Sequence, residues 1–149
     1  MTKLWTIGYE KVGAAAFVAA LKDANVELVL DIRELPNSRR AGFSKNIHAG
    51  HLDAAGVGYG HLKALGTPKA GRDAAKKGDV AAMHAIFDQK LATPESQLAL
   101  REAVDLGKAK RVCLMCLEHD WRGCHRAIVA RHLESFGFEA VHLAPEATP

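Results

Sequence analysis

The pattern of apolar and polar residues along the chain predicts short strands that alternate with helices. Runs of mostly apolar side chains predict strands over residues 3–8, 26–33, 57–62, 110–117 and 138–143. Apolar residues at helical spacing predict helices over residues 14–24, 45–55, 79–92, 94–106 and 123–136. The stretch 66–72 contains two glycines and a proline, so we expect it to form a loop.

Strands that alternate with helices indicate the α/β fold class. We expect a single three-layer domain over residues 1–143, with a mostly parallel five-stranded sheet, helices on both faces and a frayed tail at 144–149. The simplest arrangement places strand 3–8 beside strand 110–117. Because ligands of such sheets bind beyond the carboxyl ends of the strands, we expect a site at that edge.

Three residues mark expected helix boundaries. Ser44 is placed to cap the start of helix 45–55, since its hydroxyl could accept a hydrogen bond from a free backbone N–H group. Gly56 is placed to end the same helix, and Gly107 to end helix 94–106.

The composition fits one domain outside the membrane. The chain has 149 residues, of which 48% are hydrophobic, and this is enough for a substantial core. No apolar run approaches the roughly 20 residues that a membrane span needs, and we identify no signal peptide. Three cysteines without framework spacing indicate reduced thiols. We therefore expect a cytoplasmic protein that does not contact a membrane.

The excess positive charge lies in one predicted loop. Residues 33–45 hold four cationic residues and one acidic residue, which accounts for the whole net charge of +3. The loop follows a strand, and its cationic and hydroxyl groups suit a phosphate or a carboxylate, although a solvated surface loop is the alternative. The Phe43 ring could stack on a base. Ligand contacts are expected from Arg33, Ser38, Arg39, Phe43, Ser44 and Lys45 in this stretch, and from Tyr9, His61 and Arg126 elsewhere at the same sheet edge.

The stretch from Cys113 to Arg126 runs from a strand into a helix start and combines several reactive groups. Glu118 follows the strand, and its carboxylate is a candidate acid or base. Cys124 is expected in the first helical turn, where its thiol pKa would fall, but it could equally be a small buried side chain. His125 could carry a proton or simply pack.

Two charged residues lie where they need partners. Asp31 belongs to the apolar strand 26–33, where an unpaired carboxylate would be costly, so Arg33 or Arg126 is expected beside it. Asp31 is then either part of a structural ion pair or a catalytic group. Arg126 heads an apolar helical stripe and is expected to reach over the sheet edge to Glu118, Asp31 or a bound anion.

Three familiar spacings are discounted. Cys113 and Cys116 have the spacing of metal ligands, but residues three apart in a strand point to opposite faces, so a zinc knuckle is not expected. Cys116 and Arg122 have the C-x5-R spacing of anion-cradling loops, but Glu118 and Asp120 between them would repel an anion. The glycine-rich stretch 66–71 lacks the ending of a phosphate loop, and no cofactor is expected.

Several short motifs follow one another in order over nearly the whole chain. They are Thr6-Ile-Gly-Tyr9, Asp31-Ile-Arg33 with Pro36 and Ser38-Arg39, Gly42-Phe-Ser-Lys45, Tyr59 with His61-Leu62 and Leu65-Gly66, Cys116-Leu-Glu118, and Cys124-His-Arg126. Together they resemble the DUF488 family of small bacterial proteins of unknown function. The resemblance implies one α/β domain whose signature residues, Tyr9 and His61 among them, cluster at one edge of the sheet. It implies no established activity.

The leading hypothesis is a small enzyme that acts on a phosphorylated or nucleotide-like substrate. A mixture of carboxylates with arginines favours catalysis over passive binding. The anion would be held by Arg33, Arg39 and Arg126, with Glu118 or Asp31 as acid or base and Cys124 or His125 assisting.

Two other hypotheses belong to different classes. The first is a non-catalytic module that binds a nucleotide or a nucleic acid, whose affinity would fall steeply with salt. The second is a Cys/His metal site built from Cys116, Cys124 and His125, with His119 as an optional further ligand.

Overall fold

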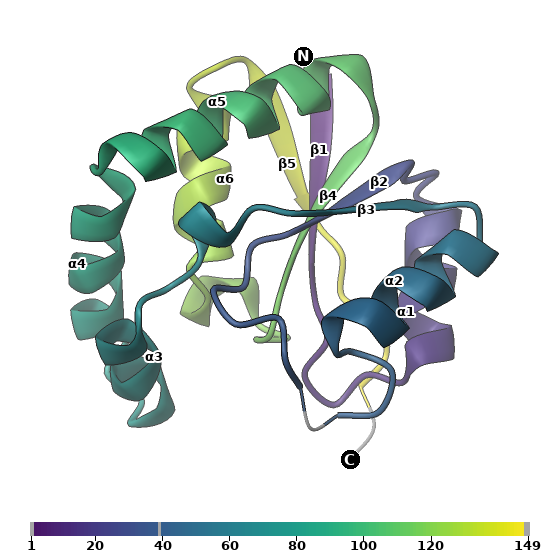
Figure 1. Cartoon of the computed structure of the whole chain (residues 1–149), viewed down its shortest axis with the longest axis horizontal. Coiled ribbons are helices and arrows are strands. Elements are labelled where there is room, and N and C mark those ends of the chain that lie inside the picture. Colours follow the sequence, from purple (N-terminus) through teal and green to yellow (C-terminus); the bar gives the residue numbers. More distant parts are fainter. Residues whose placement is uncertain (1, 39, 148–149) are drawn as a thin grey trace.

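The computed structural model describes residues 2–38 and 40–147. Its five strands form a sheet in the order β3-β2-β4-β1-β5, and every neighbouring pair is parallel. The strands are β1 (Thr2–Gly8), β2 (Leu28–Asp31), β3 (Gly58–His61), β4 (Val112–Cys116) and β5 (Phe138–His142). The α/β class and the predicted neighbourhood of the first and fourth strands are confirmed, and β4 lies at the centre of the sheet (Figure 1).

Helices cover both faces of the sheet, because the buried side chains of the strands alternate between two core clusters. Trp5, Cys113 and Met115 pack with helices α1 (Ala14–Asp23) and α2 (Lys45–Ala54). Leu4 and Leu114 point to the other face. That face is covered by α4 (Val80–Leu91), α5 (Pro94–Ala109) and α6 (Arg126–Glu134), which lie on the opposite side of the sheet from α1 and α2 in Figure 1.

The helix boundaries follow the predicted signals in part. Gly56 has φ +77° just beyond α2, the left-handed conformation expected of a glycine that ends a helix. Ser44 does precede α2, but its hydroxyl donates to the Ser38 carbonyl instead of capping the helix. Gly107 does not end its helix. It lies inside α5, where an added Cβ would be 2.9 Å from the Phe138 ring, so its lack of a side chain allows close packing against β5.

The stretch predicted as a loop after β3 contains a helix. Gly66, Thr67 and Pro68 are irregular, but α3 (Lys69–Lys76) begins directly after the proline and packs on α4. Proline is compatible with a helix start, and an internal glycine does not prevent a helix that packs against a neighbour. Within residues 2–38 and 40–147, no helix combines the length and apolar character needed to cross a membrane.

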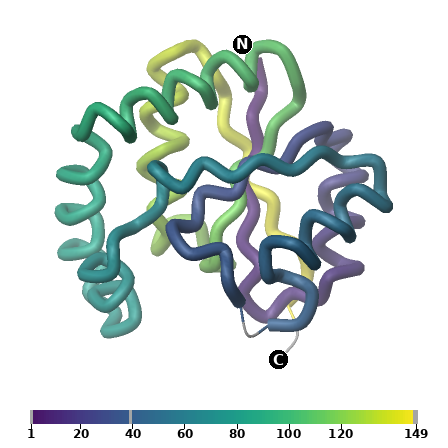
Figure 2. Tube along the Cα trace, viewed as in Figure 1, coloured from purple at the N-terminus to yellow at the C-terminus, as the bar shows by residue number. Residues whose placement is uncertain are grey.

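Gly66 brings two distant segments together. An added Cβ would lie 2.2 Å from the backbone nitrogen of Glu34, so the segments that follow β2 and β3 are in direct contact there. Both segments leave the sheet on the side where β4 also ends, as the Cα trace shows (Figure 2).

The last helix begins later than its apolar pattern predicts. A single 3₁₀ turn, η2 (Trp121–Gly123), precedes it, and His125 is the N-cap residue. Cys124 is extended, with φ −116° and ψ 147°, so it lies before the first helical turn instead of within it. The Cys124 N–H donates to the Trp121 carbonyl, which completes the 3₁₀ turn and separates it from α6.

His48 is a buried polar residue in the core on the α1 side. Its ring is 1% exposed and packs edge-on against Phe17 and Tyr59, and within the described chain its Nε2 atom has no hydrogen-bond partner. Burial and the nearby charge of Arg33 lower the pKa of His48 to about 4. The imidazole is therefore neutral in the folded protein at neutral pH.

We predict that His48→Leu reduces the acid sensitivity of the fold. In the unfolded chain His48 takes up a proton near the ordinary histidine pKa of 6.5, whereas the folded chain resists protonation down to about pH 4. Stability is therefore lost as the pH falls below 6.5, by about 2 kcal/mol between about pH 7.5 and pH 5. Urea unfolding at both pH values should show a smaller loss in His48→Leu. The exposed His51→Leu change is the control, and equal losses in all three proteins would contradict the prediction.

Candidate functional site

A cleft of about 490 Å³ opens beyond the carboxyl ends of β1, β2 and β4. Its most deeply buried lining residues include Cys116 at the end of β4 and His125 at the start of α6, with Glu118 beside them. The segments after β1 and β2 and the helices α3 and α4 complete the lining, which includes Tyr9, Glu10, Arg33, Glu34, Arg72, Lys76 and Met83. The edge predicted from the fold class therefore holds a cavity.

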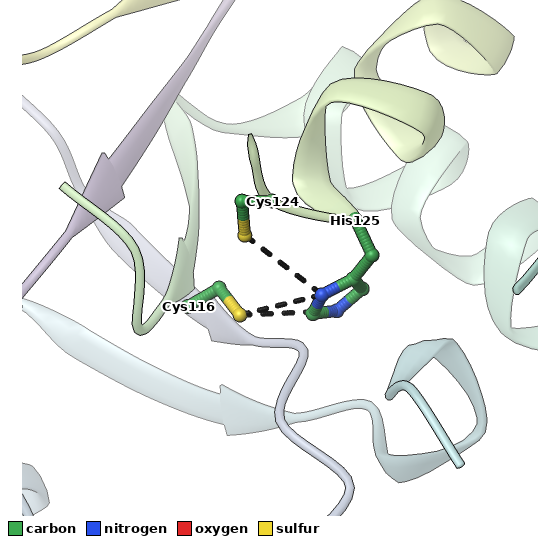
Figure 3. Close-up of side chains that lie close together, drawn as sticks. All are labelled: Cys116, Cys124 and His125. Atoms are coloured by element: carbon green, nitrogen blue, oxygen red, sulfur yellow. Dashed lines mark hydrogen bonds between the residues drawn. The ribbon is translucent and has the colours of Figure 1, made fainter. Parts of the chain in front are cut away.

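Two thiols and an imidazole converge at the bottom of this cleft. Cys116 Sγ lies 3.4 Å and Cys124 Sγ 3.8 Å from His125 Nδ1, and the three atoms all lie within 4.8 Å of one another. Figure 3 shows Cys116 pointing from the end of β4 toward Cys124 and His125, which come from the segment just before α6. Cys116 and His125 line the cleft, whereas Cys124 is fully buried behind them.

The orientation of the His125 ring is fixed by the backbone of β2. Its Nε2 atom lies 2.8 Å from the Ile32 carbonyl oxygen. A carbonyl oxygen can only accept a hydrogen bond, so Nε2 carries the proton. In the neutral ring Nδ1 is then bare, and Cys116 Sγ lies nearer to it, at 3.4 Å, than to Nε2, at 4.0 Å.

Glu118 adds a carboxyl group to the same cluster. Its Oε2 atom lies 3.8 Å from Cys116 Sγ. Burial, reinforced by the charge of Cys124, raises the pKa of Glu118 to about 8. Burial also raises the pKa of Cys116. Burial alone would raise the pKa of Cys124 as well, but the interactions of Cys124 with Cys116 and His125 outweigh burial and lower that pKa. At neutral pH, Glu118 can therefore donate a proton and Cys124 can carry the negative charge.

Arg126 is fully buried, and it does not line the cleft. Its Nε atom donates to Thr6 Oγ1 at 3.1 Å, and its two terminal nitrogens donate to the carbonyl oxygens of Glu118 and His119. The guanidinium was expected to reach a carboxylate or a bound anion, but backbone carbonyls take its hydrogen bonds. Arg126 therefore holds the turn after β4 in place and does not face a ligand.

Asp31 and Arg33 form the ion pair that the apolar strand predicted. The carboxylate accepts from Arg33 Nε at 2.9 Å and Nη2 at 2.7 Å, and from the Tyr59 hydroxyl at 2.5 Å. Burial alone would raise the pKa of Asp31, but the hydrogen bonds and charge of Arg33 outweigh it and lower that pKa. Arg33 also donates to the Phe43 carbonyl, so most of its donors are occupied. Its side chain nevertheless lines the cleft. Asp31 lies behind it.

Two expected ligand contacts have other partners. Phe43 is fully buried, stacks on Tyr9 with ring centroids 4.7 Å apart and meets Phe17 edge-on. Its ring is therefore not available to stack on a base. His61 Nε2 is hydrogen-bonded to the Arg33 carbonyl at 2.7 Å, and His61 does not line the cleft.

The rest of the basic loop is organised by its own hydrogen bonds. Ser44 donates to the Ser38 carbonyl at 3.0 Å and accepts from the Ser38 N–H, which closes the loop on itself. Lys45 is exposed, and neither it nor the two serines line the cleft. Arg39 lies outside the described residues.

The cationic side of the cleft comes from α3, which the sequence pattern did not reveal. Arg72 donates to the Glu34 carboxylate and to the Thr67 carbonyl, both at 2.8 Å, and it lines the cleft together with Lys76. Their spacing of four residues is the signal that could have found them, because it places both on one face of a helix. The glycines and proline of this stretch favoured a loop and concealed that signal.

Most of the chain matches one family. The model of the family described as "Domain of unknown function DUF488" matches residues 13–133. The chain belongs to the DUF488 family. The comparisons with curated proteins and with solved structures found no match.

The DUF488 match includes the whole thiol–imidazole cluster, while β1 lies outside it. A glycine in β1 nevertheless shapes the site. A Cβ on Gly8 would lie 1.8 Å from the Glu118 carbonyl oxygen and 2.8 Å from Arg126 Nη1. The absence of a side chain at Gly8 is what lets β1 approach the turn that carries Glu118.

We predict that Gly8→Ala destabilises this DUF488 domain by about 3 kcal/mol or more, because its methyl group would meet backbone that cannot move without breaking the Arg126 hydrogen bonds. Gly13→Ala is the matched control. No atom lies within 4 Å of a Cβ there, and Gly13 has φ −76°, which alanine adopts. Thermal and urea unfolding of both variants would check this. A wild-type melting temperature in Gly8→Ala would contradict the packing described.

Proposed function

We propose that this protein is a small cytoplasmic enzyme that acts on a phosphorylated or nucleotide-like substrate bound in the cleft. One observation carries the proposal: cationic side chains and reactive groups line the same cavity. Arg72 and Lys76 come from α3, whereas Cys116, Glu118 and His125 lie where β4 leads into α6. Binding groups beside acid–base groups are typical of an active site.

The cleft lining holds three cationic side chains, Arg33, Arg72 and Lys76, and three carboxyl groups, Glu10, Glu34 and Glu118, and Lys76 is the group that supports an anionic substrate. The Glu34 carboxylate is already neutralised by Arg72 in a 2.8 Å ion pair. The raised pKa of Glu118 leaves that group largely protonated at neutral pH. Lys76 has no ion-pair partner among the described residues, so its ammonium group is available to a phosphate.

The contacts also support a division of roles among the carboxyl groups. Asp31 is committed to its ion pair with Arg33 behind the cleft and does not reach the cavity. Glu118 lines the cavity, and its pKa of about 8 suits a group that gives and takes protons near neutral pH. We therefore assign the acid–base role to Glu118, with Arg72 and Lys76 in the anion-binding role.

We predict that a panel of nucleotides, sugar phosphates and inorganic phosphate contains compounds that raise the melting temperature. Lys76→Ala and Arg72→Ala should each weaken binding at least about tenfold, the cost of losing a hydrogen bond to a charged group. Lys77→Ala is the control, since Lys77 is exposed and does not line the cleft. If no phosphate compound stabilised the wild type, or if all three variants responded alike, this cleft would not be an anion site.

We predict that Glu118→Gln separates catalysis from binding. The amide keeps the size of the carboxyl group but cannot transfer a proton, so the variant should bind a stabilising phosphate compound normally and convert it at least about 100-fold more slowly. Product formation followed by mass spectrometry would measure this. Binding without any conversion by the wild-type protein would instead identify a non-catalytic binding module. Equal conversion by both proteins would remove Glu118 from the reaction.

A further inference from the structure

We infer that Cys116 Sγ, Cys124 Sγ and His125 Nδ1 form a zinc-binding site with its remaining coordination position on the cleft side. The three atoms belong to fully or almost fully buried side chains, and they come from two segments that meet only in the folded protein. Two thiolates and one imidazole are a donor set that zinc prefers among the common divalent ions.

The spacing of the donor atoms fits a tetrahedral ion. With Zn–S bonds of about 2.3 Å and Zn–N bonds of about 2.0–2.1 Å, a tetrahedral site has S···N edges of about 3.6 Å. The observed separations from His125 Nδ1 are 3.4 Å to Cys116 Sγ and 3.8 Å to Cys124 Sγ. Both S···N separations thus lie within about 0.2 Å of the edge that the ion requires, and the two sulfurs lie within 4.8 Å of each other.

The imidazole is also prepared for this role. Histidines that bind metals through one nitrogen generally donate the other N–H to a carbonyl or carboxylate, which fixes the ring. His125 does this through its Nε2 contact with the Ile32 carbonyl, and its Nδ1 lies within 3.8 Å of both sulfurs. In Figure 3 both thiols point at the same side of the ring.

The other nearby candidates do not join the site. Cys113 belongs to the core cluster on the opposite face of the sheet, as the alternation along β4 requires. His119, which the sequence made a candidate ligand, bonds to the Pro145 carbonyl through its Nε2 atom at 2.8 Å, away from the cluster. The protein therefore supplies three donors, Cys116, Cys124 and His125.

The position of the cluster indicates what the fourth coordination site would face. Cys124 is fully buried on the inner side, whereas Cys116 and His125 border the cavity, so the free position opens toward the cleft. Three protein ligands with one open position are the arrangement of catalytic zinc sites. Glu118 Oε2 lies 3.8 Å from Cys116 Sγ, so its carboxyl group would lie beside an ion held at this site.

In the proposed enzyme, zinc would polarise an oxygen of the bound phosphate. Only this role of the ion rests on the proposed function. The binding site itself is argued from the donor geometry. The two can therefore fail separately, since zinc binding can be measured without any phosphate ligand.

The experiment uses the full chain without a histidine tag, reduced, stripped of metal and titrated with Zn²⁺ against a chromophoric chelator. We expect one zinc per chain. Cys116→Ser, Cys124→Ser and His125→Gln each remove one donor atom. Each variant should lose more zinc affinity than the roughly 10–100-fold that removal of an outer hydrogen-bond partner costs. Cys113→Ala is the matched control and should bind zinc as the wild type does.

A second measurement covers variants that fail to fold. Co²⁺ added to the wild-type protein should give the intense visible bands of a tetrahedral site and thiolate-to-metal charge transfer. Absence of these bands, less than stoichiometric zinc, or a Cys116–Cys124 disulfide that persists under reducing conditions would overturn the metal site. Stoichiometric zinc without any response to phosphate compounds would support the metal site and remove the proposed function.

Discussion

The hydrogen bonds of the buried Arg126 guanidinium fix the geometry on which the site depends. They join the Thr6 hydroxyl of β1 to the carbonyl groups of Glu118 and His119 in the turn after β4. The buried guanidinium has no carboxylate partner among the described residues, so these hydroxyl and carbonyl dipoles stabilise its charge. Each carbonyl would lose its hydrogen-bond partner if the Arg126 side chain were removed. The turn can pass so close to β1 only because Gly8 has no side chain.

A second set of contacts fixes the other half of the cleft. The Asp31–Arg33 pair and the Tyr59 hydroxyl join the ends of β2 and β3, and the Arg33 side chain also holds the Phe43 carbonyl of the basic loop. The Arg33 side chain therefore organises the protein's own chain. Two further cationic side chains of the cleft lining, Arg72 and Lys76, lie on α3.

The sequence was sufficient for the parts that depend on periodicity. Alternating apolar segments predicted the parallel sheet and the β1–β4 pair, and the buried carboxylate of Asp31 predicted its arginine partner. The same alternation correctly separated Cys113 from Cys116. The helix α3 was missed because Gly66, Pro68 and Gly71 resemble a loop. The carbonyl partners of Arg126 could not be predicted, because residue types do not reveal how the backbone of a turn is oriented.

The placement of the charged and reactive groups on different parts of the fold has a consequence for how this protein can diverge. The thiols, the imidazole and the carboxyl group lie on the central strands and the start of α6, where Gly8 and Arg126 leave little freedom. Arg72 and Lys76 lie on α3, which packs on α4 at the margin of the sheet. Replacements in α3 can therefore change the charges that face the cleft without disturbing the side chains at the end of β4 and the start of α6.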